Sequence, residues 1–69
     1  MAIVKCLEVI AQSDKSWEDA AQQALTEVSK SVHGIQSIWI KDLQAIVENN
    51  RISKYRLDAK ISFLVDESR

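Results

Sequence analysis

The sequence contains no proline, and Gly34 is its single glycine. Proline and glycine mark most linkers and chain breaks, so their scarcity excludes a flexible linker, a low-complexity tract or a repeat boundary. A chain of 69 residues also has the length of one small domain. We therefore expect a single domain over residues 1–69.

Cysteine and histidine are equally scarce, with one residue of each. Cys6 cannot form an internal disulfide, and no Cys and His residues are spaced as in a zinc site. We interpret Cys6 as a small buried hydrophobic residue and His33 as a helix-end residue. Because catalysis needs converging groups, we expect no enzyme and no catalytic residue.

We predict no metal site within one chain. The carboxylates of the predicted strands have two interpretations. They form cross-strand or intersubunit charge pairs, or they are metal ligands that several chains bring together at an oligomer axis. These carboxylates belong to Glu8, Asp42 and Glu48.

A large charge of either sign is absent, since nine Lys and Arg residues face ten Asp and Glu residues. A net charge of −1 gives no basic surface for nucleic acid and no attraction to an acidic membrane. No charged start followed by a long apolar run is present, so we expect neither a signal peptide nor a membrane span. These observations favour a cytoplasmic protein, in which a single reduced cysteine is ordinary.

The chain has few means of stabilising a small core. A domain of this size is marginally stable without disulfides, metals or association, and the first two are excluded above. Hydrophobic residues make up 46% of the sequence and fall on both faces of the predicted strands. We therefore expect a homo-oligomer.

Alternating hydrophobicity predicts a β-hairpin in the second half of the chain. Residues 35–48 and 51–65 are the two strands, and Asn49-Asn50 is a two-residue loop that accepts positive φ. With this loop, the predicted cross-strand pairs are Ile38 with Ile61, Trp39 with Lys60, Ser37 with Ser62, Ile40 with Ala59, Lys41 with Asp58 and Leu43 with Arg56. A loop longer by one residue would move every side chain to the opposite face.

The first half predicts a strand and a helix. Residues 3–10 form the strand, residues 12–15 a polar connection, and Ser16 with Asp19 a capping box that starts a helix at Trp17. The helix is amphipathic, about four turns long, and ends near Gly34. The fold class is thus α+β, in the order β-α-β-β.

The alanine-rich helix is expected to cover one face of a three-stranded sheet. The other face carries the apolar residues Leu43, Ala45, Val47, Ile52 and Trp39 beside the charged residues Lys41, Arg56, Asp58 and Lys60. A mixed patch of this kind is typical of an interface. Trp39 has two interpretations, a subunit contact or a platform on which a planar ligand stacks, with Arg56 and Lys60 as partners for a phosphate.

Nearly the whole chain, in this order of elements, resembles the dodecins. The similarity runs through residues 4–10, Ser13, the helix start at residues 16–20, the strand from Ile35, and residues 55–66. It implies a three-stranded antiparallel sheet wrapped around one helix, a homododecamer of cubic symmetry, and storage of flavins between stacked tryptophans without turnover.

The sequence departs from that family pattern at two positions. Ser37 stands where flavin-binding dodecins carry tryptophan, and Arg56 stands where they carry a glutamine that contacts the flavin. We expect a dodecin-like small-molecule binding or storage protein, for riboflavin or FMN with an altered pocket, and Ser37, Trp39, Arg56 and Lys60 as ligand-binding residues. The alternative is a non-flavin dodecin that acts as a structural cage or binds ions or another ligand.

Overall fold

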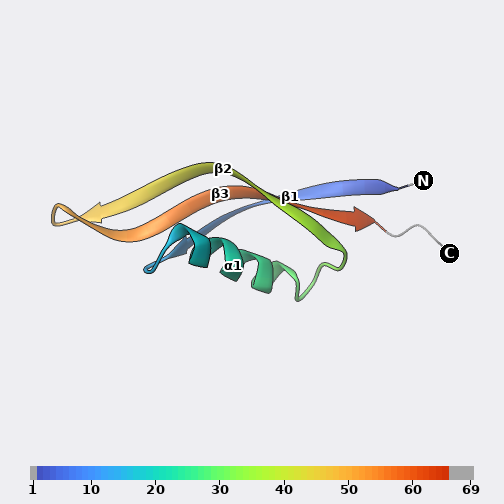
Figure 1. Cartoon of the computed structure of the whole chain (residues 1–69), viewed down its shortest axis with the longest axis horizontal. Coiled ribbons are helices and arrows are strands. Elements are labelled where there is room, and N and C mark those ends of the chain that lie inside the picture. Colours follow the sequence, from blue (N-terminus) through green and yellow to red (C-terminus); the bar gives the residue numbers. More distant parts are fainter. Residues whose placement is uncertain (1, 66–69) are drawn as a thin grey trace.

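A computed structural model describes residues 2–65 and has four elements. These are strand β1 (Ile3–Ser13), helix α1 (Trp17–Val28), strand β2 (Ile35–Glu48) and strand β3 (Arg51–Val65). The three strands form one antiparallel sheet in the order β1-β3-β2, and α1 packs on β1 and β3 (Figure 1). The predicted β-α-β-β order and the antiparallel sheet around one helix are confirmed.

Strand β1 is longer than the sequence predicts. It continues past Ile10 to Ser13, where we expected a polar connection. The long central strand β3 provides partners for the extra residues, so that Gln12 pairs with Arg56 and Ser13 with Tyr55. Backbone pairing with β3 therefore outweighs the polar character of the segment.

Helix α1 starts where the capping signal predicts. The Oγ of Ser16 accepts a hydrogen bond from the backbone N–H of Asp19 at 2.9 Å, which satisfies one free donor of the first turn. The Asp19 carboxylate in turn accepts a hydrogen bond from the buried Ser13 hydroxyl at 2.6 Å. The helix start is thereby fixed to the end of β1.

The predicted helix end is wrong. The helix stops at Val28 rather than near Gly34, and the Ser29 hydroxyl donates to the carbonyl of Thr26 at 2.8 Å. Backbone hydrogen bonds of the turn type continue after the helix as far as the N–H of Val32, so His33 lies beyond the helix. The apolar period of the sequence continues into these turns, which is why it did not mark the boundary.

Gly34 serves the entry into β2. Its φ is +76°, a conformation that side-chain-bearing residues rarely adopt, and its carbonyl accepts a hydrogen bond from the N–H of Leu64 at 2.9 Å. A Cβ atom at this position would lie 3.2 Å from the Leu64 carbonyl oxygen. The glycine thus brings the chain close to β3 before β2 starts.

The β2–β3 hairpin has the predicted loop. The predicted register holds from Ser37 to Ile40 and again beside the loop, where Val47 pairs with Ile52, but it is shifted between Asp42 and Ile46. Asn49 and Asn50 both have positive φ, and Trp39 pairs with Lys60 as expected. A β-bulge at Lys41 then shifts the ladder by one residue, so the predicted pairs Lys41 with Asp58 and Leu43 with Arg56 are wrong. The observed pairs are Asp42 with Asp58, Leu43 with Leu57, Gln44 with Arg56 and Ala45 with Tyr55.

Trp17 contacts the segment that follows this bulge. Its indole N–H donates to the carbonyl of Gln44 at 3.0 Å, and its ring meets Tyr55 edge-on with 4.9 Å between centroids. The shift turns Leu43 and Ala45 to the helix side of the sheet, against our expectation that they lie on the other face. Trp17 itself packs against the core.

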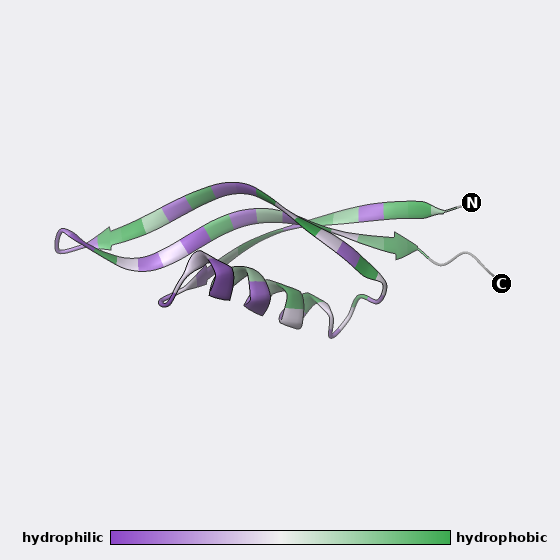
Figure 2. Ribbon diagram, in the orientation of Figure 1, coloured by the Kyte–Doolittle hydropathy of each residue, from purple (hydrophilic) through white to green (hydrophobic). Residues whose placement is uncertain are grey.

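The core is small. Its buried hydrophobic residues are Ala20, Ala24, Leu57, Ala59 and Ile61. Ten large hydrophobic side chains among residues 2–65 remain exposed, and Figure 2 shows hydrophobic positions alternating with polar ones along the strands. Among residues 2–65, no helix has the length and apolarity needed to cross a membrane.

Candidate functional site

The sheet face that α1 does not cover, called the outer face below, carries an exposed tryptophan. Trp39 on β2 retains 61% of its accessible surface, and it lies opposite Lys60 on β3. The Lys60 ammonium is 5.7 Å from the centre of the indole ring, within the range of a cation–π interaction. The predicted position of Trp39 on this face is correct.

Ser37 lies on the same face, next to Trp39 along β2. Its hydroxyl is hydrogen bonded to that of Ser62 at 2.6 Å, across the strand pair. Cys6 of β1 pairs with the other side of Ser62 and is exposed, so our interpretation of Cys6 as a buried hydrophobic residue is wrong. Edge strand β1 has no cover over this part of its outer face, which explains that exposure.

The fourth predicted ligand residue, Arg56, lies apart from the other three. Its Nε donates to Oε1 of Gln12 at 3.1 Å, and its neighbour on β2 is Gln44. Arg56 is four residues from Lys60 along β3, about 13 Å at the usual rise of a strand. The structure thus brings Ser37, Trp39 and Lys60 together but not Arg56.

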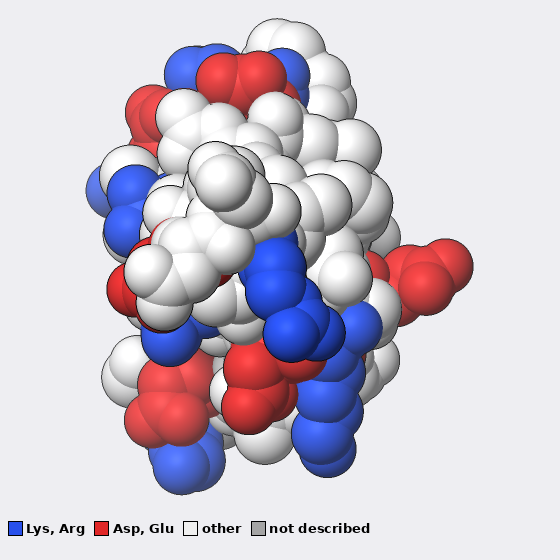
Figure 3. All heavy atoms as spheres, turned by 90° about the vertical axis from the view of Figure 1, so that its left-hand side faces the viewer, with Lys and Arg blue, Asp and Glu red and all other residues white. Residues whose placement is uncertain are grey.

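A charged cluster between these two parts was missed by sequence reasoning. Lys41 of β2 donates to Oε2 of Glu8 on β1 at 3.0 Å, and Asp58 of β3 lies between the two strands with Asp42 as its cross-strand neighbour. The Lys41 bulge places its ammonium within reach of β1, which no pattern of alternation signals. Figure 3, a view from the hairpin end, likewise shows acidic and basic side chains intermixed.

The cluster changes the proton affinity of its carboxyl groups. The hydrogen bond from Lys41, and secondly one with Asp58, lowers the pKa of Glu8. The hydrogen bond with Glu8, and secondly burial, raises the pKa of Asp58, and the negative charges of Glu8 and Asp42 act in the same direction. Within this cluster Glu8 is therefore the stronger acid and Asp58 the weaker one.

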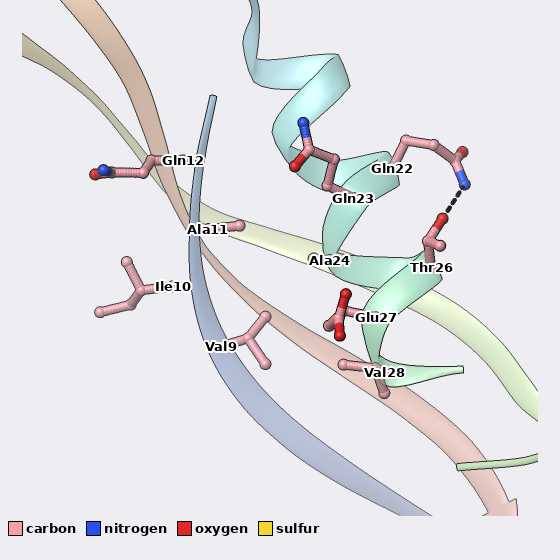
Figure 4. Close-up of a pocket in the computed structure, with 10 residues that line it drawn as sticks. All are labelled: Val9, Ile10, Ala11, Gln12, Gln22, Gln23, Ala24, Thr26, Glu27 and Val28. Carbon is pink, nitrogen blue, oxygen red and sulfur yellow. Dashed lines mark hydrogen bonds between the residues drawn. The ribbon is translucent and has the colours of Figure 1, made fainter. Parts of the chain in front are cut away.

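The helix side of the molecule has two grooves, one along each flank of α1. The α1–β1 groove has a volume of about 490 Å³, and its polar lining residues are Gln12, Gln22, Gln23, Thr26 and Glu27. Figure 4 shows Val9 and Ala11 of β1 turned toward α1, whereas Ile10 and Gln12 point away from it. The α1–β2 groove, of about 470 Å³, is lined by Ser16, Trp17, Glu18, Ala21, Ile40, Leu43 and Leu57. Within residues 2–65 of one chain, no group of three or more His, Cys, Asp or Glu residues could hold a metal ion.

The fold and this sheet face can now be compared with known proteins. A sequence model of the Dodecin family matches residues 3–66, of which Asp66 lies outside the described residues. The chain belongs to the dodecin family. Dodecins bind small ligands and self-assemble, and this dodecin has their fold.

Several solved structures are similar over nearly the whole chain. A mutant dodecin of Thermus thermophilus has a TM-score of 0.91 and 19% identity, covering 99% of this chain and 100% of its own. A dodecin from Streptomyces davaonensis has a TM-score of 0.89 and 14% identity, with coverage of 96% and 97%. A calcium-chelating antigen of Mycobacterium tuberculosis, calcium dodecin, has a TM-score of 0.81 and 27% identity, with coverage of 97% and 96%. Curated proteins give no sequence match.

Proposed function

We propose that this dodecin is a homododecamer that binds and stores a small planar molecule without turning it over, with riboflavin or FMN as the leading ligand. Trp39 is the residue on which the ligand stacks, and Ser37 and Lys60 flank it. A cytoplasmic location, in which the exposed Cys6 stays reduced, is part of the same proposal.

The observation that carries this proposal is the exposed ring of Trp39. A tryptophan with 61% of its surface free is costly to leave in water, so a ligand or a neighbouring subunit is expected to cover it. Around the ring, Lys60 supplies a positive charge and Ser37 a hydroxyl group. An aromatic ring beside a cation and a hydroxyl suits a planar ligand with polar edges.

Titration with riboflavin and FMN tests the proposal. Stacking on Trp39 should quench flavin fluorescence, and Trp39→Ala should abolish the quenching while the oligomer persists. Ser37→Trp, which provides the tryptophan of the flavin-binding pattern, should strengthen it. Absence of quenching in the unmodified protein at high concentration would reject flavin as the ligand.

A second candidate function is a cage whose assembly is its role, with ions or another ligand at its symmetry axes. Two contacts within one chain favour it, the Ser37–Ser62 hydrogen bond and the position of the Lys60 ammonium beside the Trp39 ring. These contacts occupy polar groups that a flavin would otherwise use. If the protein is such a cage, Trp39→Ala should disrupt assembly, and neither the unmodified protein nor this variant should bind flavin.

A further inference from the structure

The far end of the β2–β3 hairpin extends beyond the rest of the fold. Strand β1 pairs with β3 only as far as Tyr55, so the hairpin arm, residues 46–54, has no third strand beside it. Figure 1 shows the arm passing beyond both α1 and the end of β1, in a molecule 55 Å long. A two-stranded hairpin alone in water is marginally stable, so this arm needs a partner surface.

The arm carries an exposed aliphatic pair. Val47 and Ile52 lie opposite each other and retain 59% and 54% of their accessible surface. Ala45 faces the helix side with Tyr55, and alternation along β2 puts Val47 on that same side. A second register shift leaves Ser53 as an extra residue on β3, so that Ile52 pairs with Val47. The pair thus extends the helix side of the sheet past the end of the helix.

The α1–β2 groove offers the surface that this pair lacks. Its walls are Trp17 and Ala21 on the helix and Ile40 and Leu43 on the strand, and Leu43 is 52% exposed. The α1–β1 groove is rimmed by three glutamines, a threonine and a glutamate, so it suits aliphatic side chains less well.

We infer that the hairpin arm of one copy packs its Val47–Ile52 pair into the α1–β2 groove of a second copy. The groove of the same chain is out of reach, because Val47 follows Leu43 along one strand at about 13 Å. A second copy is the partner because dodecins self-assemble and every copy carries both surfaces. The inference concerns assembly and does not depend on the proposed ligand.

Disulfide crosslinking between two single-cysteine chains tests this contact. In a Cys6→Ser background, a chain with Leu43→Cys is coexpressed with a differently tagged chain carrying Ile52→Cys, and the assembled protein is oxidised. Where the two kinds of chain meet in the assembly, a disulfide should form between position 43 of one chain and position 52 of the other. A disulfide requires Cα atoms within about 7 Å, so its formation shows that the two positions are in contact. Both positions are exposed in the single chain, so neither change should impair folding.

A matched experiment replaces Leu43→Cys with Thr26→Cys in the α1–β1 groove, and we expect little crosslinking there. A strong Thr26–Ile52 crosslink, Ile52–Ile52 crosslinks alone, no crosslink in an assembled oligomer, or a monomer in solution would each overturn the inference. As a second measure, Val47→Asp should raise the concentration needed for assembly about tenfold or more, whereas Gln44→Asp should change it little.

Discussion

The ammonium of Lys41 on β2 lies 3.0 Å from the carboxylate of Glu8 on β1, and the contact passes over the central strand β3. It joins the two edge strands of the sheet on the outer face. An exposed ion pair contributes little to folding by itself, but this one is the main reason that the pKa of Glu8 is lowered. The pKa of Glu8 is lowered, and that of Asp58 beside it is raised.

The raised pKa of Asp58 predicts a pH-dependent stability. A carboxyl group whose pKa is higher in the folded state contributes stability at low pH, and loses it as the pH rises through the folded pKa. Asparagine has the shape of a protonated aspartic acid and stays uncharged at every pH. Asp58→Asn should therefore raise the melting temperature at pH 7. The gain should shrink as the pH falls below the usual carboxyl range. The exposed Asp14→Asn is the control, and an unchanged or lower melting temperature for Asp58→Asn at pH 7 would contradict the prediction.

Ile61 is fully buried in the sheet, so its truncation should be costly. We expect Ile61→Ala to lower the free energy of unfolding by about 2–5 kcal/mol, through lost apolar contact and the cavity left behind. Denaturant titrations at one fixed protein concentration measure this, because the stability of an oligomer depends on concentration. Ile10→Ala, at a largely exposed position, should cost less than about 1 kcal/mol in folding; equal costs at both sites would show that the core is misassigned.

Removing the helix cap at Ser16 should measurably lower the stability of the protein. Ser16→Ala removes the acceptor for the N–H of Asp19 and should cost about 1 kcal/mol of unfolding free energy. Ser31→Ala, in the exposed turn after α1, should stay within about 0.5 kcal/mol of the unmodified protein. Thermal unfolding followed by circular dichroism compares the two, and a loss confined to Ser31→Ala would refute the assigned cap.

Gly34→Ala should be destabilising for two reasons, its positive φ and the 3.2 Å approach of the new Cβ to the Leu64 carbonyl. A left-handed conformation costs an L-residue about 1–2 kcal/mol, which denaturation should reveal. Asn50→Gly is the reciprocal test, since glycine accepts the φ of +63° at the hairpin loop and should leave stability unchanged or raised. Equal stability of Gly34→Ala and the unmodified protein would mean that the entry into β2 adjusts freely.

Local signals in the sequence were sufficient for the order of elements. The Ser16 cap, the Asn49-Asn50 loop and the alternation along residues 55–65 each depend on neighbouring residues, and the structure confirms all three. The placement of Trp39 opposite Lys60 followed because the ladder is regular from the point where Ser37 meets Ser62.

Other boundaries were not marked by the apolar pattern. The extension of β1 to Ser13 follows from its pairing with β3, which the apolar period does not encode. The end of α1 at Val28 is a local feature, marked by the Ser29 hydroxyl that donates to the Thr26 carbonyl, and the apolar period does not encode it either. The register shift at Lys41 is likewise not signalled by alternation, and the Gln44 carbonyl that follows it accepts a hydrogen bond from the indole of Trp17, 27 residues away.

The sequence by itself determined a β-α-β-β domain with a small core and with Trp39 on the sheet face opposite the helix. Only the tertiary structure decided which residues share a face beyond Ile40. One inserted residue turned Leu43 toward the helix and brought Lys41 to Glu8, because in a strand of period two a shift of one position exchanges the two faces.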